Sequence, residues 1–183
     1  DLAPEVSQQL DATIPHLDTT RLAGVMVGNA VPEAERGLQF GRIIAAKALG
    51  IEVPGITINR YCASGLESIA MATAKIRTGM AECIVAGGTE SMSLVPTAGW
   101  KTVPSYNIAK DQPDYYLGMG LTAEAVANEY KVSRELQDEF AYHSHRKADI
   151  AIAEGYYKSG ILPITVEEVY LNEKGKKATR NYI

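Results

Sequence analysis

Three short apolar runs alternate with two stretches of helical spacing in the first half of the chain. The runs cover residues 23–28, 55–59 and 82–86, and they are rich in the β-branched and aliphatic side chains typical of buried strands. Between them, residues 40–49 and 66–76 place apolar side chains three and four positions apart, as an amphipathic helix does. This strand–helix–strand–helix–strand order predicts an α/β fold with a parallel-rich sheet and helices packed against it.

The periodicity is lost at about residue 95. Residues 95–118 contain three prolines and no clear repeat, and so long an irregular stretch in a compact protein is usually functional or a lid. Helices are predicted near residues 122–130 and 133–154, with Thr122 and Ser133 as their N-caps.

Short strand pieces are predicted at residues 164–166 and 169–171, near the end of the chain. The polar residues 172–175 follow the second piece. They predict a hairpin in which Gly175 takes the left-handed conformation.

Composition narrows the functional classes. The 183 residues are 46% hydrophobic and 22% charged, with a net charge of −4, so the chain has neither the low hydrophobicity of a disordered protein nor the basic excess of a nucleic-acid binder. The sequence contains no apolar run long enough for a membrane span, and its opening residues do not resemble a signal peptide. Two separated cysteines suit reduced thiols in a cytoplasmic protein better than disulfides or structural zinc.

Cys62 has the sequence environment of a nucleophile. It stands where a predicted strand gives way to a helix, and we place it on the first helical turn, where unpaired backbone N–H groups and the helix dipole favour the thiolate. Small residues follow it, so a thioester could approach the backbone closely. A packed structural thiol is the alternative interpretation for Cys62. Cys83 is predicted to lie mid-strand among aliphatic residues, where the structural interpretation is the better one.

Four ordered motifs resemble those of the thiolase family. The sequence Asn-Arg-x-Cys-x-Ser-Gly at residues 59–65 resembles the nucleophile motif, and Gly-Gly-Thr-Glu-Ser-Met-Ser at 87–93 resembles the next signature. Residues 119–124 and 133–138 resemble two later segments in the same order. The similarity implies a thiolase-like half-core at residues 1–94, with its first strand missing. An incomplete inserted loop or lid domain would follow at residues 95–183.

The resemblance implies a reaction. In thiolases the cysteine equivalent to Cys62 attacks a 3-ketoacyl-CoA, acetyl-CoA leaves as its enolate, and free CoA then removes the acyl group. The family takes its base from a Gly-His-Pro motif and a second acid/base from another cysteine, both in its carboxy-terminal half, and neither motif occurs here. His16, His143 and His145 are interpreted as non-catalytic. The sequence is therefore expected to be a fragment that is inactive alone.

Other site residues follow from the same resemblance. Glu90 and Ser91 are expected either to support the active-site loops by hydrogen bonds or simply to form a turn. Met119 corresponds to a position that contacts CoA, and its side chain suits the pantetheine group. The face formed by Leu66, Ile69, Thr73 and Ile76 is expected to be buried between two sheets. If one sheet is missing, the alternatives are cover by a second copy or partial exposure.

The expected full activity is that of an acetyl-CoA C-acyltransferase in fatty-acid β-oxidation. CoA would be a substrate, so no cofactor and no metal are expected, and a homodimer or homotetramer is implied. Alternatives are a biosynthetic acetoacetyl-CoA thiolase, a related ketoacyl synthase, and a non-catalytic lipid carrier or scaffold with a thiolase-like fold. The Asn59–Gly65 motif disfavours the synthase, and its intact cysteine disfavours the carrier.

Overall fold

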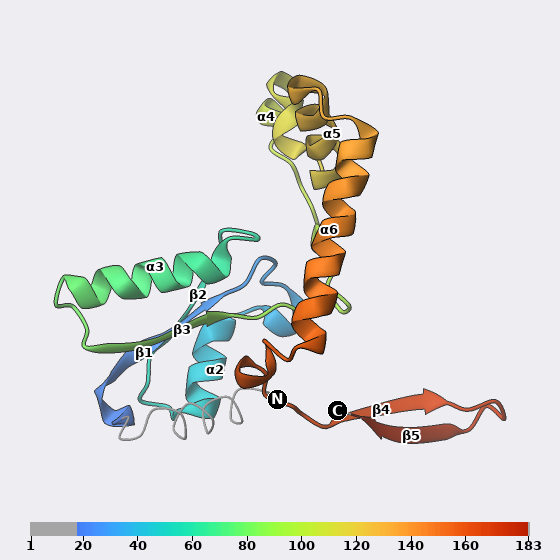
Figure 1. Cartoon of the computed structure of the whole chain (residues 1–183). Coiled ribbons are helices and arrows are strands. Elements are labelled where there is room, and N and C mark those ends of the chain that lie inside the picture. Colours follow the sequence, from blue (N-terminus) through green and yellow to red (C-terminus); the bar gives the residue numbers. More distant parts are fainter. Residues whose placement is uncertain (1–17, 183) are drawn as a thin grey trace. The chain divides into compact units, whose positions relative to one another are not determined.

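The computed structural model describes residues 18–182 (Figure 1). Their contacts separate two compact units. Residues 18–102 and 164–182 belong to the first unit, and residues 103–163 form the second. His16 lies outside the described residues.

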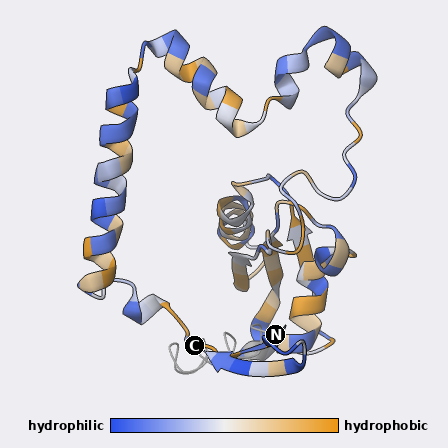
Figure 2. Ribbon diagram, turned by 90° about the vertical axis from the view of Figure 1, so that its right-hand side faces the viewer, coloured by the Kyte–Doolittle hydropathy of each residue, from blue (hydrophilic) through white to orange (hydrophobic). Residues whose placement is uncertain are grey.

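A three-stranded parallel sheet forms the centre of the first unit, and it confirms the predicted α/β order. Its strands are β1 (Leu22–Gly28), β2 (Gly55–Ile58) and β3 (Cys83–Gly88), in the spatial order β2-β1-β3. The central strand is buried at six of its seven positions, because helices cover both faces of a parallel sheet. Figure 2 shows apolar residues concentrated in these strands, whereas polar residues run along much of α6 (Arg134–Ala153).

Two helices pack on opposite faces of this sheet (Figure 1). Alternate β1 residues point to opposite faces, so Val25 and Val27 pack with Ala45 of α2 (Phe40–Ala48), and Met26 packs with Ala72 of α3 (Ser64–Arg77). Both helices end as predicted, with glycines of positive φ directly after their C-caps. Gly50 has φ +111° and Gly79 has φ +73°.

The buried face of α3 consists of small residues. Ser64, Ser68 and Ala72 are buried against the sheet, and the Ser68 hydroxyl donates to the carbonyl oxygen of Gly87 at 2.8 Å. The larger apolar side chains lie on the other side, where Leu66 is 71% and Ile69 50% exposed. Of the alternatives for that face, the described residues show the exposed one. Spacing of three and four residues identifies a face of a helix, but it does not say which face meets the sheet.

The second unit is helical. It contains α4 (Tyr106–Asp111), the 3-10 helix η3 (Pro113–Tyr116), α5 (Met119–Tyr130), α6 and the 3-10 helix η4 (Lys158–Gly160). The region expected to be irregular over residues 95–118 is therefore partly helical, a correction explained by local backbone hydrogen bonds such as that from Ala109 N–H to the Ser105 carbonyl at 2.9 Å.

The two N-cap predictions for this unit have different outcomes. Thr122 lies inside α5 and its hydroxyl bonds the Gly118 carbonyl, so Gly118 is the N-cap and the Thr122 prediction is wrong. Ser133 caps α6 as predicted, accepting a hydrogen bond from Leu136 N–H at 3.3 Å.

An antiparallel hairpin contains the last described residues. Its strands are β4 (Val166–Leu171) and β5 (Lys177–Tyr182), so the two strand pieces expected around residues 164–171 are one continuous strand that begins at Val166. Gly175 has φ +67°, which confirms the left-handed turn position. No helix within residues 18–182 is long and apolar enough to cross a membrane.

A glycine at the end of β1 allows α3 to approach this strand closely. A Cβ added to Gly28, the last residue of β1, would lie 2.6 Å from the backbone nitrogen of Gly65. One added to Gly88, the last residue of β3, would lie 3.4 Å from the Gly65 Cα. Side chains at Gly28 would therefore push the first turn of α3 away from the sheet.

We predict that Gly28→Ala lowers the free energy of unfolding by about 2 kcal/mol or more, since a Cβ here meets backbone that cannot move aside. Urea denaturation measures the change. Gly87→Ala in β3 is the matched control, because its added Cβ would meet no atom within 4 Å. Equal destabilisation by both variants would contradict the close-packing explanation.

Candidate active site

Cys62 lies in the loop between β2 and α3. The first helical residue is Ser64 and the N-cap is Ala63, so Cys62 lies at the N-terminal end of the helix as predicted, but two residues before it rather than on its first turn. The reason is local: residues 60–64 form a closed turn that must be completed before the helix begins. The thiol is exposed, in agreement with a role in which a substrate reaches it directly.

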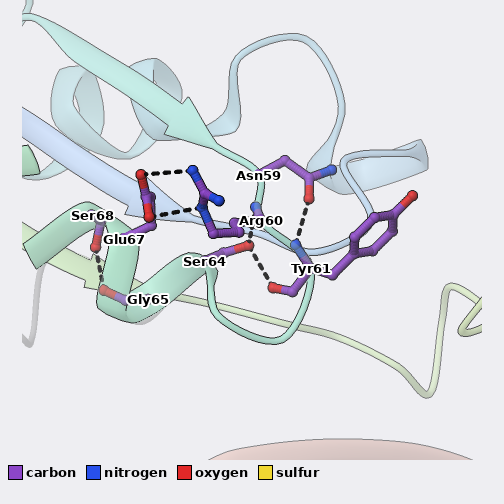
Figure 3. Close-up of polar contacts among 7 residues, drawn as sticks. All are labelled: Asn59, Arg60, Tyr61, Ser64, Gly65, Glu67 and Ser68. Atoms are coloured by element: carbon purple, nitrogen blue, oxygen red, sulfur yellow. Dashed lines mark hydrogen bonds and ion pairs between the residues drawn. The ribbon is translucent and has the colours of Figure 1, made fainter. Parts of the chain in front are cut away.

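Side-chain hydrogen bonds close this turn (Figure 3). The Ser64 hydroxyl accepts from Arg60 N–H at 2.8 Å and donates to the Tyr61 carbonyl oxygen at 2.5 Å. The Asn59 side chain accepts from Tyr61 N–H at 2.9 Å. Tyr61, the residue before the cysteine, has φ +46°, a left-handed conformation that is unusual for a bulky residue.

An ion pair ties the same turn to the helix. Arg60 Nε lies 2.8 Å from Glu67 Oε2, and its Nη2 donates to Glu67 Oε1 at 3.2 Å (Figure 3). Glu67 also lies in the first turn of α3, where a carboxylate interacts favourably with the helix dipole. The Arg60 side chain is 65% exposed, so this pair orients the loop more than it stabilises the fold.

Backbone donors remain available beside Cys62. Among the described residues, the N–H groups of Gly65 and Leu66 have no hydrogen-bond acceptor, whereas the next amide, that of Glu67, bonds the Ala63 carbonyl. Free amides of a first helical turn carry partial positive charge and point toward the residues before the helix. This end of α3 therefore favours negative charge near Cys62.

The C-terminal ends of the three strands meet next to this loop. Asn29 links them: its N–H donates to the Ile58 carbonyl at 2.9 Å, and its side-chain amide donates to the Thr89 carbonyl at 2.7 Å. Thr89 N–H in turn bonds the Gly28 carbonyl at 3.0 Å. This edge is where open α/β sheets bind ligands.

Glu90 links the segment after β3 to the segment after β1 through hydrogen bonds and an ion pair. Its carboxylate accepts from Ala30 N–H at 2.7 Å and from the Asn29 side chain at 3.2 Å, and it forms an ion pair with Arg36. Arg36 is 3% exposed, so this pair is largely shielded from water. Nearby, the Glu33 carboxylate accepts from Trp100 N–H at 2.6 Å and holds the same two segments together.

The other candidate residues have different local settings. The Ser91 carbonyl accepts from Leu94 N–H and Val95 N–H, a turn arrangement that does not use its side chain. Met119 is the first residue of α5 in the second unit and is 70% exposed. His143 and His145 lie on exposed positions of α6.

Cys83 lies at the start of β3 rather than in mid-strand, a correction to its predicted place. It is partly buried against a core cluster that includes Leu22 and Val85, and it pairs with Leu22 of β1. Among residues 18–182 there is no group of three or more His, Cys, Asp or Glu side chains that could hold a metal.

Comparison with known proteins identifies the family. The family model described as "Thiolase, N-terminal domain" matches residues 1–180. The chain belongs to the thiolase family. A structure of the acetyl-CoA acetyltransferase of Bacillus anthracis superposes with a TM-score of 0.73 at 29% identity, covering 98% of this chain and 47% of that one.

Curated relatives carry thiolase names. The chain is 48% identical over 160 residues to a 3-ketoacyl-CoA thiolase of Bacillus subtilis, covering 87% of this chain and 41% of that protein. It is 38% identical over 164 residues to an acetyl-CoA acetyltransferase of Escherichia coli, covering 82% of this chain and 41% of the relative. The chain thus spans less than half the length of these relatives.

Some residues around the thiolase motif received no individual role from the sequence. The sequence gives Asn29, Asn59, Arg60 and Ser64 no role beyond the family resemblance of the segments that contain them, and it gives Arg36 none. Their spacing in the sequence does not show that they meet. Only Asn59 had a recognisable signal, because an asparagine two residues before a bulky one can form an Asx turn.

We predict that Glu90→Gln lowers the free energy of unfolding by about 2 to 3 kcal/mol, since it leaves the shielded Arg36 guanidinium without its counter-charge. Chemical denaturation monitored by circular dichroism measures this. Glu82→Gln is the control: Glu82 pairs with Arg21 on the surface, with side chains 72% and 62% exposed, and its loss should barely move the midpoint. Similar shifts for both variants would mean that the buried pair stabilises the fold no more than the exposed one does.

We predict that iodoacetamide alkylates Cys62 faster than Cys83. Cys62 is exposed in front of the helix, whereas Cys83 packs partly against the core. Trypsin separates the two thiols into peptides 61–75 and 78–101, so mass spectrometry of timed samples gives both rates. Equal rates in the folded protein, or faster labelling of Cys83, would refute the assignment of Cys62 as the accessible thiol.

Proposed function

We propose that Cys62 is the nucleophile of a 3-ketoacyl-CoA thiolase. The observation that supports this most directly is an exposed thiol in a closed turn immediately before the free first-turn amides of α3. The thiolate attacks the 3-keto carbon, and the bond between C2 and C3 breaks. Acetyl-CoA leaves as its enolate and is protonated at C2. The thiol of a second CoA then attacks the Cys62 thioester, releases an acyl-CoA two carbons shorter, and restores the cysteine.

The described residues contribute to this reaction in three ways. The Asn59–Ser64 turn presents the sulfur, and the Gly65 and Leu66 amides favour negative charge beside it. Glu90 holds the segments that follow β1 and β3, and Ser91 begins the next turn of that support. Proton transfer at the enolate carbon belongs to the histidine and second cysteine that the family carries in its carboxy-terminal half.

The substrate assignment rests on the relatives. The 48% identity to a 3-ketoacyl-CoA thiolase favours degradation of 3-ketoacyl-CoA in fatty-acid β-oxidation. The acetyl-CoA acetyltransferase relatives and structure support the second candidate, in which two acetyl-CoA molecules condense. CoA is a substrate in both, and the exposed Met119 would contact its pantetheine group. A cytoplasmic homodimer or homotetramer is part of the same proposal.

We predict an acyl adduct on Cys62 when the protein that contains this chain meets a long-chain 3-ketoacyl-CoA without free CoA. Without an acceptor the acyl-enzyme accumulates, and peptide 61–75 should gain an acyl group two carbons shorter than that of the substrate. That mass reports cleavage between C2 and C3, because simple transacylation would leave the intact 3-ketoacyl group. Added CoA should remove the adduct.

The controls use the two cysteines. Cys62→Ala should abolish the adduct, whereas Cys83→Ala should keep it. An adduct formed from acetoacetyl-CoA but not from longer substrates would favour the biosynthetic candidate. Failure of every 3-ketoacyl-CoA to label Cys62 in a folded protein would overturn the proposed reaction and leave the carrier or scaffold alternative.

A further inference from the structure

Tyr61 holds a strained conformation without side-chain packing to maintain it. Its φ of +46° is one that residues with a Cβ adopt at a cost, and its side chain is 73% exposed. A strained residue keeps such a conformation only when its surroundings impose it. Because the ring is in solvent, the constraint must act on the Tyr61 backbone.

Two polar side chains form hydrogen bonds with the N–H and the carbonyl group of Tyr61. Asn59 Oδ1 accepts from the Tyr61 N–H at 2.9 Å, and the Ser64 hydroxyl donates to the Tyr61 carbonyl at 2.5 Å (Figure 3). The same hydroxyl accepts from Arg60 N–H at 2.8 Å, so it links the peptide group that precedes Arg60 to the one that follows Tyr61. Ser64 is 3% exposed, and water therefore competes little for these bonds.

We propose that Asn59 and Ser64 are positioning residues for the Cys62 thiol, acting through the left-handed backbone of Tyr61. The inference rests on the proposed role of Cys62 as nucleophile. If the hydrogen bond to Asn59 or the one from Ser64 is lost, Tyr61 relaxes to negative φ. The following peptide group and the Cys62 side chain then rotate with it. The Cys62 thiol, which lies two residues before the first residue of α3, leaves its position in the turn, and its reactivity falls.

The test compares alkylation of Cys62 by iodoacetamide in variants of the 183-residue chain. Ser64→Ala removes the hydrogen bonds of the Ser64 hydroxyl, and Asn59→Ala removes the hydrogen bond to the Tyr61 N–H. Each should slow alkylation of Cys62 by about 2- to 10-fold, the factor that corresponds to one hydrogen bond. The rate at Cys83 in the same molecule is the internal reference, because general loosening of the fold would raise it, whereas a local change in the turn leaves it unchanged.

Ser68→Ala is the matched control. Ser68 lies one turn further along α3, is fully buried, and bonds the carbonyls of Gly65 and Gly87 rather than the turn. Its loss should lower the unfolding midpoint and leave the Cys62 rate unchanged. Equal slowing by Ser64→Ala and Ser68→Ala would overturn the proposal, since the effect would then come from general weakening of the helix.

Tyr61→Gly separates positioning from a merely structural role. Glycine adopts positive φ without cost, so the turn needs less support. Combined with Ser64→Ala, it should restore the Cys62 rate to within about 2-fold of the starting chain. No restoration in a folded double variant would contradict the proposal. If Ser64→Ala does not fold, Asn59→Ala replaces it, because Asn59 is exposed. Adding Tyr61→Gly to Asn59→Ala should then restore the Cys62 alkylation rate in the same way.

The proposed function can fail separately. If Cys62 forms no acyl adduct from a 3-ketoacyl-CoA, the thiolase reaction is wrong even where the alkylation rates respond as expected. If the adduct forms normally but Asn59→Ala and Ser64→Ala leave the alkylation rate unchanged, only the positioning role is wrong.

Discussion

The close contact between the first turn of α3 and Gly28, the glycine that ends β1, determines the geometry of this site. Gly28 has no side chain, so the backbone at Ser64 and Gly65 lies against the end of this strand. The helix must then present small residues to the sheet along its length, which explains why Ser68 and Ala72 are buried and larger residues are not. The loop before α3 is short and begins at the end of β2. Fixing the helix therefore restricts where Cys62 can lie.

A second constraint acts on the loop itself. Four residues connect Asn59 to the first turn of the helix, and the chain reverses direction within them. The positive φ of Tyr61 allows this reversal. A hydrogen bond to the Asn59 side chain and one from the Ser64 hydroxyl stabilise this backbone conformation. The thiolase motif thus combines two kinds of residue. Under the proposed function Cys62 carries the chemistry, while Asn59 and Ser64 hydrogen-bond the backbone around it.

The sequence predicted the fold better than the site. Apolar runs identified all three strands of the sheet, because a central parallel strand such as β1 must be apolar on both faces. The sequence correctly places Cys62 at the junction of β2 and α3 and at the N-terminal end of that helix, but on its first turn rather than two residues before it. The error came from the hydroxyl of Ser64, whose bonds close a turn that delays the helix start, and hydropathy does not report such bonds.

Local sequence patterns cannot predict polar contacts between residues that are far apart in the sequence. Glu90 was chosen from its motif, yet its partners Ala30 and Arg36 lie more than fifty positions earlier in the sequence, and only the parallel pairing of β1 with β3 brings them together. The N-cap prediction at Thr122 was wrong although it concerned only neighbouring residues. A threonine before a helical pattern suits an N-cap, but the helix begins three residues earlier at Met119. Local propensity could not reveal that extra turn.

The position of Cys62 outside the helix has a chemical consequence. A residue within the first turn directs its side chain away from the helix axis and uses its own amide in the same turn. A residue two positions earlier can instead place its side chain over the end of the axis, where the free Gly65 and Leu66 amides converge. Both arrangements benefit from the helix dipole; in the second, Cys62 precedes the helix and the Gly65 and Leu66 amides have no acceptor among the described residues. Free amides at this end of α3 carry partial positive charge, so negative charge that develops near the turn is favoured. The turn before α3, and not the helix alone, therefore determines the surroundings of the Cys62 thiol.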